Sequence, residues 1–409
     1  MKMKFPLILD GATGTELAKA GLTNDTASEL WMLEHEDAVL ELQSGYAEAG
    51  SQVLYTPTFG SSPVSLAKHG LKERTAELNM RLFELTKKAS AGRTLIGGDI
   101  GPGGLMPRPF GHLGFEELAE AFAEQAKALD EAGVDLFAVE TQMSIAEARA
   151  AFLGIRKVSD KPVFVSFTCG KDGKTLDGSD MRAALVTLQA MGAAAFGLNC
   201  SWGPDQMLPV IQSLAPYAAV PLIAKPNAGL PQFVDGQAVY DCTPEDFTAY
   251  TADFLAAGAV ILGGCCGTDK THMKALAEKV RQCGEAFALP EGDGQVYCSC
   301  EKYALAVTED MTFIPAFSCS EDFEEVLDDA AEEEGDAFRI VIDGSTDFDA
   351  FENCQYMIAK PVCFESSDAA ALEKALRLYR GLAMYEGGLP EAALAPLKEK
   401  YGLIDLAGL

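Results

Sequence analysis

The chain has 409 residues, and 61 acidic against 32 basic side chains give it a formal net charge of -29 at pH 7. This surplus of negative charge argues against nucleic acids and anionic membranes as partners, because both would repel the protein. With 48% hydrophobic residues, no apolar run long enough to cross a bilayer and no signal peptide, the chain is expected to fold around a large core in the cytoplasm.

Eight short apolar runs, each followed by a helical pattern, occupy the first 285 residues or so. The runs are continuous rather than alternating, which is typical of parallel strands covered on both faces. The expected strands are Phe5–Asp10, Gln52–Phe59, Thr94–Gly101, Val134–Thr141, Pro162–Thr168, Ala195–Ser201, Pro221–Pro226 and Val260–Cys266. Eight such units predict an α/β fold of the (β/α)8 TIM-barrel type, and a doubly wound open sheet is the second interpretation.

Amphipathic segments between these runs predict the barrel helices. The clearest are Asp37–Ala49, Phe115–Ala132, Met181–Met191 and Pro244–Ala257. The last of them opens with Thr243 as an N-cap and a proline at the first helical position.

The pattern changes after residue 288, so we predict a barrel domain over residues 1–288 and a small acidic α/β domain over residues 295–409. The segment Leu289–Gly294 between them has the composition of a linker. The expected elements of the second domain are a helix at Ser320–Glu334, strands at Phe338–Asp343 and Tyr356–Glu365, and helices at Asp368–Tyr379 and Pro390–Tyr401. Its sequence does not indicate a role.

Three of the eleven cysteines stand at expected strand ends. Cys200 closes the sixth strand, and Cys265 and Cys266 close the eighth. Barrel enzymes build their sites where the carboxyl ends of the strands meet, and these two strands have the same parity. Both adjacent cysteines can face the barrel axis only where the strand breaks, which the flanking glycines permit. Three thiolates would give zinc three ligands and leave a fourth position open, as in catalytic zinc sites.

The same cysteines allow other interpretations. A disulfide is disfavoured in a reducing compartment. A cysteine nucleophile would need a nearby base, and no histidine stands at an expected strand end. A redox role for Cys265 and Cys266 predicts activity in the presence of a strong chelator. The eight remaining cysteines are interpreted as small buried hydrophobic residues.

Zinc with this ligand set would activate a thiol substrate. The pKa of a free thiol is about 8.5, so little thiolate exists at neutral pH, whereas coordination deprotonates the thiol. Because three thiolate ligands make the metal electron-rich, the bound substrate sulfur stays nucleophilic. The ligand set therefore favours attack on an alkyl carbon over hydrolysis.

Four motifs resemble the homocysteine S-methyltransferase family, which includes the homocysteine-binding module of methionine synthases. They stand in the family's order over residues 1 to about 285: Asp10-Gly-Ala-Thr-Gly-Thr15, Gly197-Leu-Asn-Cys-Ser201, Pro226-Asn-Ala-Gly-Leu-Pro231 and Gly263-Gly-Cys-Cys-Gly-Thr268. The resemblance implies a (β/α)8 barrel that transfers a methyl group to a zinc-bound homocysteine thiolate and forms methionine. It also implies that Cys200, Cys265 and Cys266 are the zinc ligands.

The resemblance further indicates how homocysteine is held. Asp10 and Glu140 fall where family members hold the ammonium, and the Gly11–Thr15 loop is similar to the segment that holds the carboxylate. Taken alone, Asp10 could equally be a turn-forming residue. A glutamate is disfavoured in a buried strand, so a functional role is favoured for Glu140. The expected substrate-binding residues are Asp10, Gly11, Thr13, Thr15, Glu140 and Asn199.

Two departures from the family concern the methyl donor. Pro57 stands where many relatives have an asparagine, on the expected donor side. Residues 356–403 are faintly similar to part of a pterin-binding barrel, but the segment is too short to close one, and the sequence has no cobalamin-ligating Asp-x-His-x-x-Gly motif. The donor is therefore expected to be a small methylsulfonium or quaternary ammonium compound, or a methyl-corrinoid on a partner protein.

The alternative functions of the chain are a homocysteine-activating subunit of a multi-protein, corrinoid- or folate-dependent methionine synthase and a non-catalytic zinc- or thiol-binding scaffold.

Overall fold

The computed structural model describes residues 3–23, 25–104, 108–234, 237–284 and 286–408. Eight parallel strands form one sheet, and every strand pairs with its neighbour in parallel. In spatial order they are β1 (Leu7–Ile8), β10 (Ile261–Leu262), β7 (Leu222–Lys225), β6 (Ala195–Asn199), β5 (Val163–Phe167), β4 (Leu136–Gln142), β3 (Leu95–Ile100) and β2 (Val53–Tyr55).

One residue joins the two ends of this sheet. The backbone N–H of Gln52, just before β2, donates to the carbonyl of Ile8 in β1 over 2.7 Å. Its side-chain oxygen in turn accepts the N–H of Ile8 over 2.9 Å. The sheet is thereby nearly closed, which confirms the predicted (β/α)8 barrel and excludes the open doubly wound sheet.

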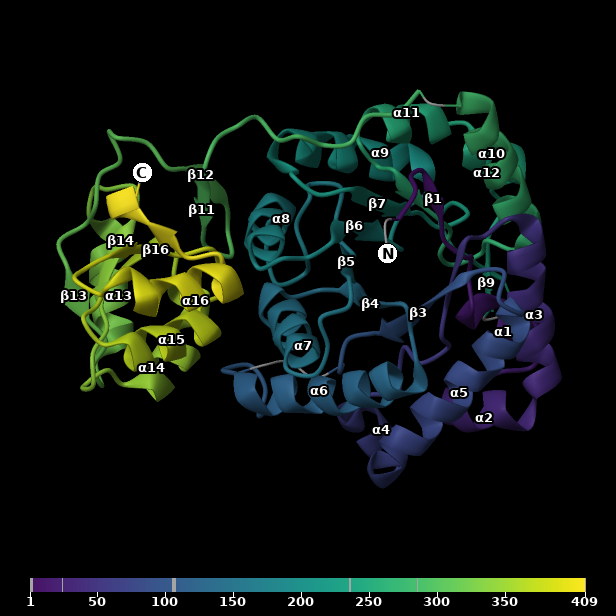
Figure 1. Cartoon of the computed structure of the whole chain (residues 1–409), viewed down its shortest axis with the longest axis horizontal. Coiled ribbons are helices and arrows are strands. Elements are labelled where there is room, and N and C mark those ends of the chain that lie inside the picture. Colours follow the sequence, from purple (N-terminus) through teal and green to yellow (C-terminus); the bar gives the residue numbers. More distant parts are fainter. Residues whose placement is uncertain (1–2, 24, 105–107, 235–236, 285, 409) are drawn as a thin grey trace.

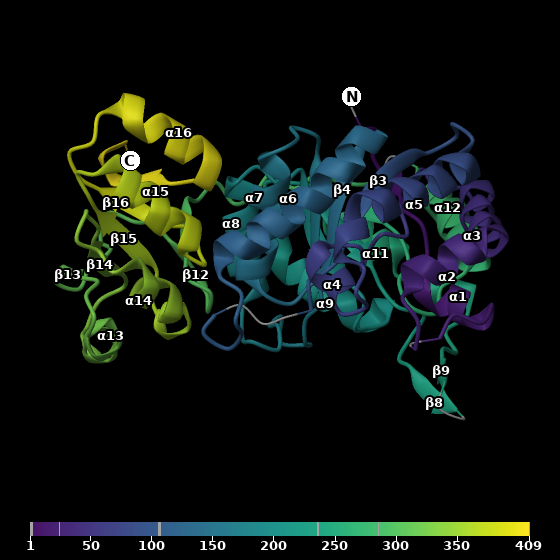
Figure 2. The ribbon, with the colours of Figure 1, turned by 90° about the horizontal axis from the view of Figure 1, so that it is seen from below.

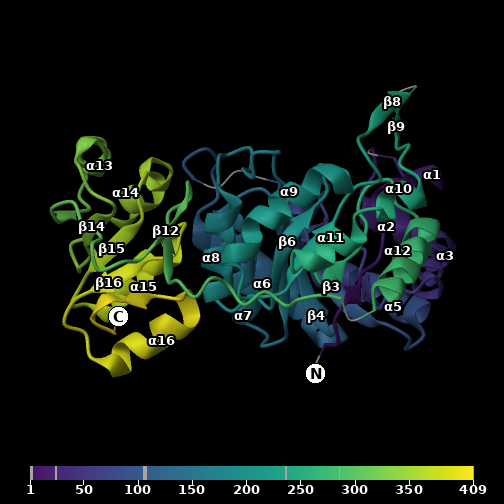
Figure 3. The same ribbon diagram turned by 90° about the horizontal axis from the view of Figure 1, so that it is seen from above.

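Helices surround the strands as an outer ring (Figure 1). The ring consists of α3 (Glu36–Ala49), α5 (Thr75–Ser90), α6 (Phe115–Ala132), α7 (Ile145–Arg156), α8 (Met181–Ala190), α9 (Pro204–Leu214), α10 (Pro244–Thr248), α11 (Thr251–Ala256) and α12 (Lys270–Cys283). Shorter elements fill the connections: α1 (Gly14–Lys19), α2 (Ser28–Glu34), α4 (Pro63–Ala67) and the 3-10 turns η1 (Lys72–Arg74) and η2 (Ala215–Tyr217). The hairpin of β8 (Gln232–Val234) and β9 (Gln237–Val239) projects from the barrel (Figures 2 and 3).

Glycines in β3 show how the barrel interior is filled. A Cβ at Gly97 would lie 2.8 Å from the Tyr55 ring, whereas one at Gly98 would meet Leu129 and Val134 at 3.2 Å. Gly97 therefore faces the interior and gives the Tyr55 ring its place there, and Gly98 faces the helices. Because side chains alternate along a strand, Asp99 is on the interior side, as Gly97 is.

A second sheet follows the barrel. The hairpin of β11 (Tyr297–Ser299) and β12 (Ala304–Ala306) leads into five parallel strands in chain order: β13 (Phe317–Ser318), β14 (Phe338–Val341), β15 (Val362–Glu365), β16 (Met384–Glu386) and β17 (Ile404–Asp405). Their connections contain α13 (Phe323–Glu332), α14 (Phe348–Asn353), η3 (Gln355–Met357), α15 (Ala369–Leu378) and α16 (Glu391–Tyr401), and η4 (Leu406–Gly408) follows β17. We call residues 295–408 the C-terminal unit.

The C-terminal unit packs against the outside of the barrel, beside α7 and α8 (Figures 1 and 2). Arg149 of α7 is 1% exposed, and its guanidinium donates to the carbonyls of Leu376 and Arg377 at the end of α15 over 2.6 and 2.9 Å. Arg377 also pairs with Glu116 of α6. As a result α7 is buried along nearly its whole length.

Several expected elements differ from the structure. The first, second and eighth strands are shorter than predicted, with two residues in β1, three in β2 and two in β10. The predicted helix Pro244–Ala257 is divided into α10 and α11, because the Thr248 hydroxyl donates back to the carbonyls of Pro244 and Glu245 and such bonds bend helices. The predicted strand Tyr356–Glu365 is wrong in its first half, since β15 begins only after Pro361. None of the described helices combines the length and hydrophobicity that crossing a membrane requires.

Candidate active site

The three predicted cysteine ligands meet at the carboxyl ends of β6 and β10. Cys200 follows β6 in a left-handed conformation with φ 64°, and its N–H donates to the carbonyl of Lys225. Cys265 and Cys266 lie in the turn after β10, which ends at Leu262. The break in the strand that two inward cysteines require is therefore present.

The sulfur atoms have the spacing of a metal site. All three lie within 4.8 Å of one another, and the Sγ atoms of Cys200 and Cys266 are 3.9 Å apart. Tetrahedral zinc with Zn–S bonds of about 2.3 Å separates its sulfur ligands by about 3.8 Å, so the three cysteines fit this ion. The buried Oδ1 of Asn227 has no hydrogen-bond partner in the described part of the chain, and the Asn227 side chain contacts Cys200. We call Cys200, Cys265 and Cys266 the sulfur cluster.

The thiols of the sulfur cluster differ in pKa. Hydrogen bonds from Cys265 and Cys266 hold the pKa of Cys200 well below that of an ordinary thiol. The same contacts, together with burial, raise the pKa of Cys265. One thiol thus ionises readily, whereas three adjacent thiolates require a cation to balance their charge.

A cavity of about 340 Å³ opens beside the sulfur cluster. Strand ends and the first two helices supply its walls. Its lining includes Asp10, Gly11, Ala12, Thr13, Gly14, Thr15, Leu17, Leu22, Glu29, Met32, Tyr55, Pro57, Phe59, Asp99, Glu140, Thr141, Lys225 and the sulfur cluster.

A β-bulge in β4 aims Glu140 into this cavity. The register with β5 shifts between Val139 and Gln142, and Thr141 has φ 58°. Asn199 fixes this irregular backbone: its Oδ1 accepts the N–H of Thr141 over 2.9 Å, and its Nδ2 donates to the Thr141 hydroxyl over 2.7 Å. Bulges beside active sites commonly redirect a side chain in this way.

Lys225, at the end of β7, is a site residue to which the sequence motifs assigned no role. It is 3% exposed, its Nζ lies 2.9 Å from Glu140 Oε2 and 3.8 Å from Asp10 Oδ1, and it stands 4.1 Å from the centre of the Tyr55 ring. Gly263 makes room for its stem, since a Cβ there would lie 3.2 Å from Lys225 Cγ. The signal in the sequence was a lysine closing an otherwise apolar strand.

Two aspartates complete the polar wall. Asp10 is 2% exposed, and its Oδ2 accepts the N–H of Tyr55 over 2.7 Å. Burial raises the pKa of Asp10 to about 6, although Lys225 lowers it in part. Asp99 is 6% exposed and also lines the cavity, a role that the motifs did not indicate. We call Asp10, Asp99, Glu140 and Lys225 the acidic cluster.

The Gly11–Thr15 loop is tied to the cysteine turn. The Thr268 hydroxyl accepts the N–H of Ala12 over 3.1 Å, and the Thr15 hydroxyl accepts the N–H of Gly267 over 3.0 Å. Gly11 is packed so closely that a Cβ would lie 2.8 Å from the Tyr46 ring.

The structure brings the expected substrate-binding residues Asp10, Gly11, Thr13, Thr15 and Glu140 to the cavity wall. Asn199 is different: it is 1% exposed and lies behind the wall, where it holds Thr141 and approaches Cys265 Sγ to 3.9 Å. Helices α1 and α2 and the segment between them contribute an outer wall that the motifs did not reveal, with Leu17, Leu22, Glu29 and Met32.

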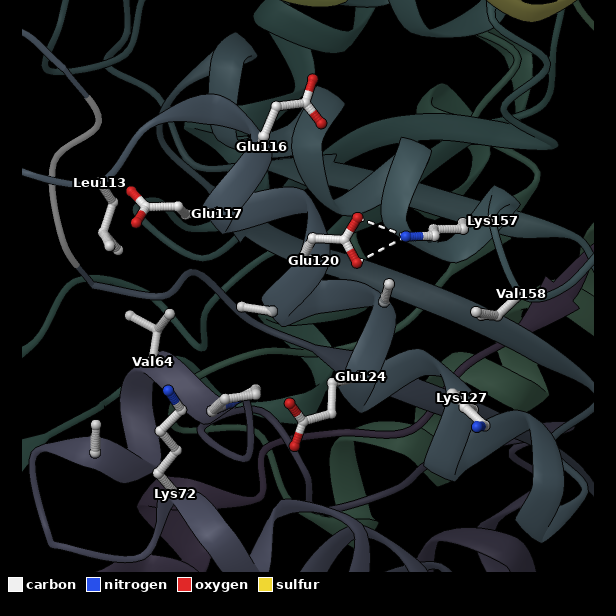
Figure 4. A pocket seen from close by; sticks show the side chains of 14 residues that line it. Val64, Lys72, Leu113, Glu116, Glu117, Glu120, Glu124, Lys127, Lys157 and Val158 are labelled. Atoms are coloured by element: carbon white, nitrogen blue, oxygen red, sulfur yellow. Dashed lines mark hydrogen bonds and ion pairs between the residues drawn. The ribbon is translucent and has the colours of Figure 1, made fainter.

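A wider groove of about 860 Å³ lies on the outside of the barrel, between α4 and α6 (Figure 4). Its charged side chains are surface glutamates and lysines, such as Glu120, which pairs with Lys157. None of its lining residues comes from a strand end. The smaller cavity with the sulfur cluster is therefore the candidate active site.

Comparison with known proteins identifies relatives of the barrel. A family model described as homocysteine S-methyltransferase matches residues 7–280. Methionine synthases of Mycobacterium leprae and Mycobacterium tuberculosis are each 30% identical, over 327 and 292 residues, which cover 76% and 67% of this chain but only 26% and 24% of theirs. The chain thus spans about a quarter of the length of these curated relatives. The metallated crystal structure of the homocysteine methyltransferase MmuM from Escherichia coli is similar, with 25% identity, a TM-score of 0.57 and coverage of 67% of this chain and 96% of that one.

Proposed function

The chain belongs to the homocysteine S-methyltransferase family, and on that premise we propose that it is a methyltransferase, which methylates the sulfur of homocysteine with the help of zinc held by Cys200, Cys265 and Cys266. The observation that carries this proposal is one cavity lined by both the sulfur cluster and the acidic cluster. A small amino acid thiol matches both: its sulfur suits the metal position, and its ammonium suits the carboxylates.

When bound, zinc would lower the pKa of the substrate thiol so that a thiolate exists at neutral pH. The residues of the chain do the rest. The acidic cluster attracts the substrate ammonium, and the backbone of the Gly11–Thr15 loop faces its carboxylate. Fixing both groups holds the sulfur in one place, which is the main contribution that positioning makes to a displacement reaction.

The methyl transfer is then an in-line displacement. The sulfur lone pair of homocysteine forms the new bond to the methyl carbon, and the bond between that carbon and the donor breaks, with its electron pair leaving on the donor. Phe59 and Pro57 line the cavity where a donor could approach. Phe59 is 41% exposed, so this side of the wall is accessible from solvent.

The first experiment tests the metal and the substrate together. Zinc content and homocysteine-dependent proton release are measured for the wild type and for Cys265→Ala and Cys266→Ala. The wild type should bind one zinc and release close to one proton per homocysteine, because a bound thiolate has lost its proton. Both variants should lose the zinc and the release. Cys283→Ala, on α12, is the matched control and should keep both.

The second experiment identifies the donor. Zinc-loaded protein and homocysteine are offered S-methylmethionine, betaine, methylcobalamin and methyltetrahydrofolate, and methionine is measured. Proton release without methionine from any donor would favour the scaffold or the homocysteine-activating subunit. A wild type that releases no proton would contradict the proposed function itself.

A further inference from the structure

The acidic cluster holds three carboxylates but only one cation. Glu140 is the closest partner of Lys225, at 2.9 Å, and Asp10 lies 3.8 Å from the same Nζ. Asp10 is also held by the N–H of Tyr55. Two of the three carboxylates are thus already engaged by groups of the protein.

Asp99 is the carboxylate left over. Its Oδ1 is buried and has no hydrogen-bond partner among the residues that the structure describes. Its main chain, in contrast, is fully used: the N–H donates to the Thr56 hydroxyl over 3.0 Å, and the carbonyl accepts from the Thr58 hydroxyl over 2.7 Å. The backbone therefore holds Asp99 firmly while its side chain faces the cavity without a partner.

An unpaired buried carboxylate is costly to a folded protein. Burial, followed by the charge of Glu140, raises the pKa of Asp99 well above its ordinary value. Such a group persists where a ligand supplies the missing partner, and perturbed carboxylates of this kind gather at functional sites.

We propose that Asp99 is the carboxylate that receives the ammonium group of the substrate, while Lys225 is a positioning residue that occupies Glu140 and Asp10. This inference rests on the proposed function. Asp99, in β3, is then the residue by which the protein distinguishes homocysteine from thiols that have no amino group. Asp10 and Glu140 then act mainly by holding Lys225 in place. The substrate ammonium binds to Asp99, the carboxylate that Lys225 does not pair with.

The test compares two thiols on two proteins. Zinc-loaded full-length wild type and Asp99→Asn are titrated with homocysteine and with 4-mercaptobutanoate, which is homocysteine without its amino group. In the wild type, homocysteine should bind at least tenfold more tightly. In Asp99→Asn its affinity should fall at least tenfold, as expected for a lost charge-assisted hydrogen bond, while that of 4-mercaptobutanoate should stay within about twofold.

Thermal unfolding of the metal-free proteins provides a second readout. Asparagine is nearly isosteric and carries no charge, so Asp99→Asn should unfold at a higher temperature than the wild type at pH 7. A carboxylate with a purely structural role would show the opposite. Asp135→Asn, just before β4 at the other end of the strands, is the control and should leave both affinities unchanged.

Each result is decisive. Equal homocysteine affinity in wild type and Asp99→Asn would overturn the assignment of Asp99 alone, as would an equal loss for both thiols. If the wild type binds neither thiol, the proposed function fails, and the proposed role of Asp99 is rejected with it.

Discussion

At the scale of single residues, Lys225 is the one cation among the three carboxylates of the acidic cluster. A lysine 3% exposed would be strongly disfavoured alone, but Glu140 and Asp10 lie beside it and the Tyr55 ring covers it. Removing one partner of a buried ion pair leaves the other charge without compensation, which costs more than the pair itself contributes.

Lys225→Met is therefore expected to lower the free energy of unfolding by about 3–5 kcal/mol, measured by denaturant titration of the metal-free protein. The double variant Lys225→Met/Glu140→Gln should recover part of this loss, because it removes the uncompensated charge. Lys171→Met, an exposed lysine near Trp202, is the control and should change stability by less than about 0.5 kcal/mol. A double variant no more stable than the single one would show that Lys225 acts by packing rather than by charge.

The raised pKa of Asp10 predicts that the stability of the protein depends on pH. Its pKa is about 6 in the folded protein and near 3.8 in the unfolded chain. Between these values the folded state binds more protons, so the stability due to Asp10 is present below about pH 4 and is lost as the pH rises to about 6, by about 3 kcal/mol. Denaturant titrations of metal-free wild type and Asp10→Asn from pH 4.5 to 7 should give a steeper decline for the wild type. Parallel curves for the two proteins would contradict a raised pKa of Asp10 in the folded state.

At the scale of elements, the sequence predicted the barrel better than the details of its rim. Continuous apolar runs identified all eight strands, and Phe115–Ala132 matches α6 at both ends. The convergence of Cys200, Cys265 and Cys266 was predictable because a motif and the strand ends coincide. The β4 bulge was not, since the positive φ of Thr141 depends on Asn199, 58 residues later. Asp99 and Lys225 were visible at strand ends, but their pairing depends on how the strands converge.

The β4 bulge stores strain at Thr141. A β-branched residue in the left-handed region costs about 1–2 kcal/mol. Thr141→Gly relieves this strain but loses the hydroxyl that accepts from Asn199. Its stability should therefore stay within about 1 kcal/mol of the wild type, while homocysteine binds more weakly because Glu140 is less fixed. Thr168→Gly, at the end of β5, has no such strain to relieve and should be clearly destabilised. Equal losses in both variants would show that Thr141 is unstrained.

At the scale of the whole molecule, the C-terminal unit and the barrel share helix α7. Barrel helices normally expose one face, yet α7 is buried from Ile145 to Ile155, because strands cover one side and the C-terminal unit the other. The unit's own sheet is polar where its strands end: Glu365 and Glu386 are exposed, and Glu386 pairs with Arg339.

Arg149 is a fully buried link in this contact, and we predict that the two parts unfold together. Its guanidinium satisfies two carbonyls at the end of α15, where the helix dipole also favours a cation. Arg149→Met would bury these carbonyls without donors, so stability should fall by about 2–4 kcal/mol. Arg156→Met, on the same helix but bonded to Ser159 and Lys161, is the control and should cost less. In calorimetry the wild type should show one transition whose calorimetric and van't Hoff enthalpies agree. Two separate transitions in the wild type would mean that the buried surface of α7 does not couple the barrel to the C-terminal unit.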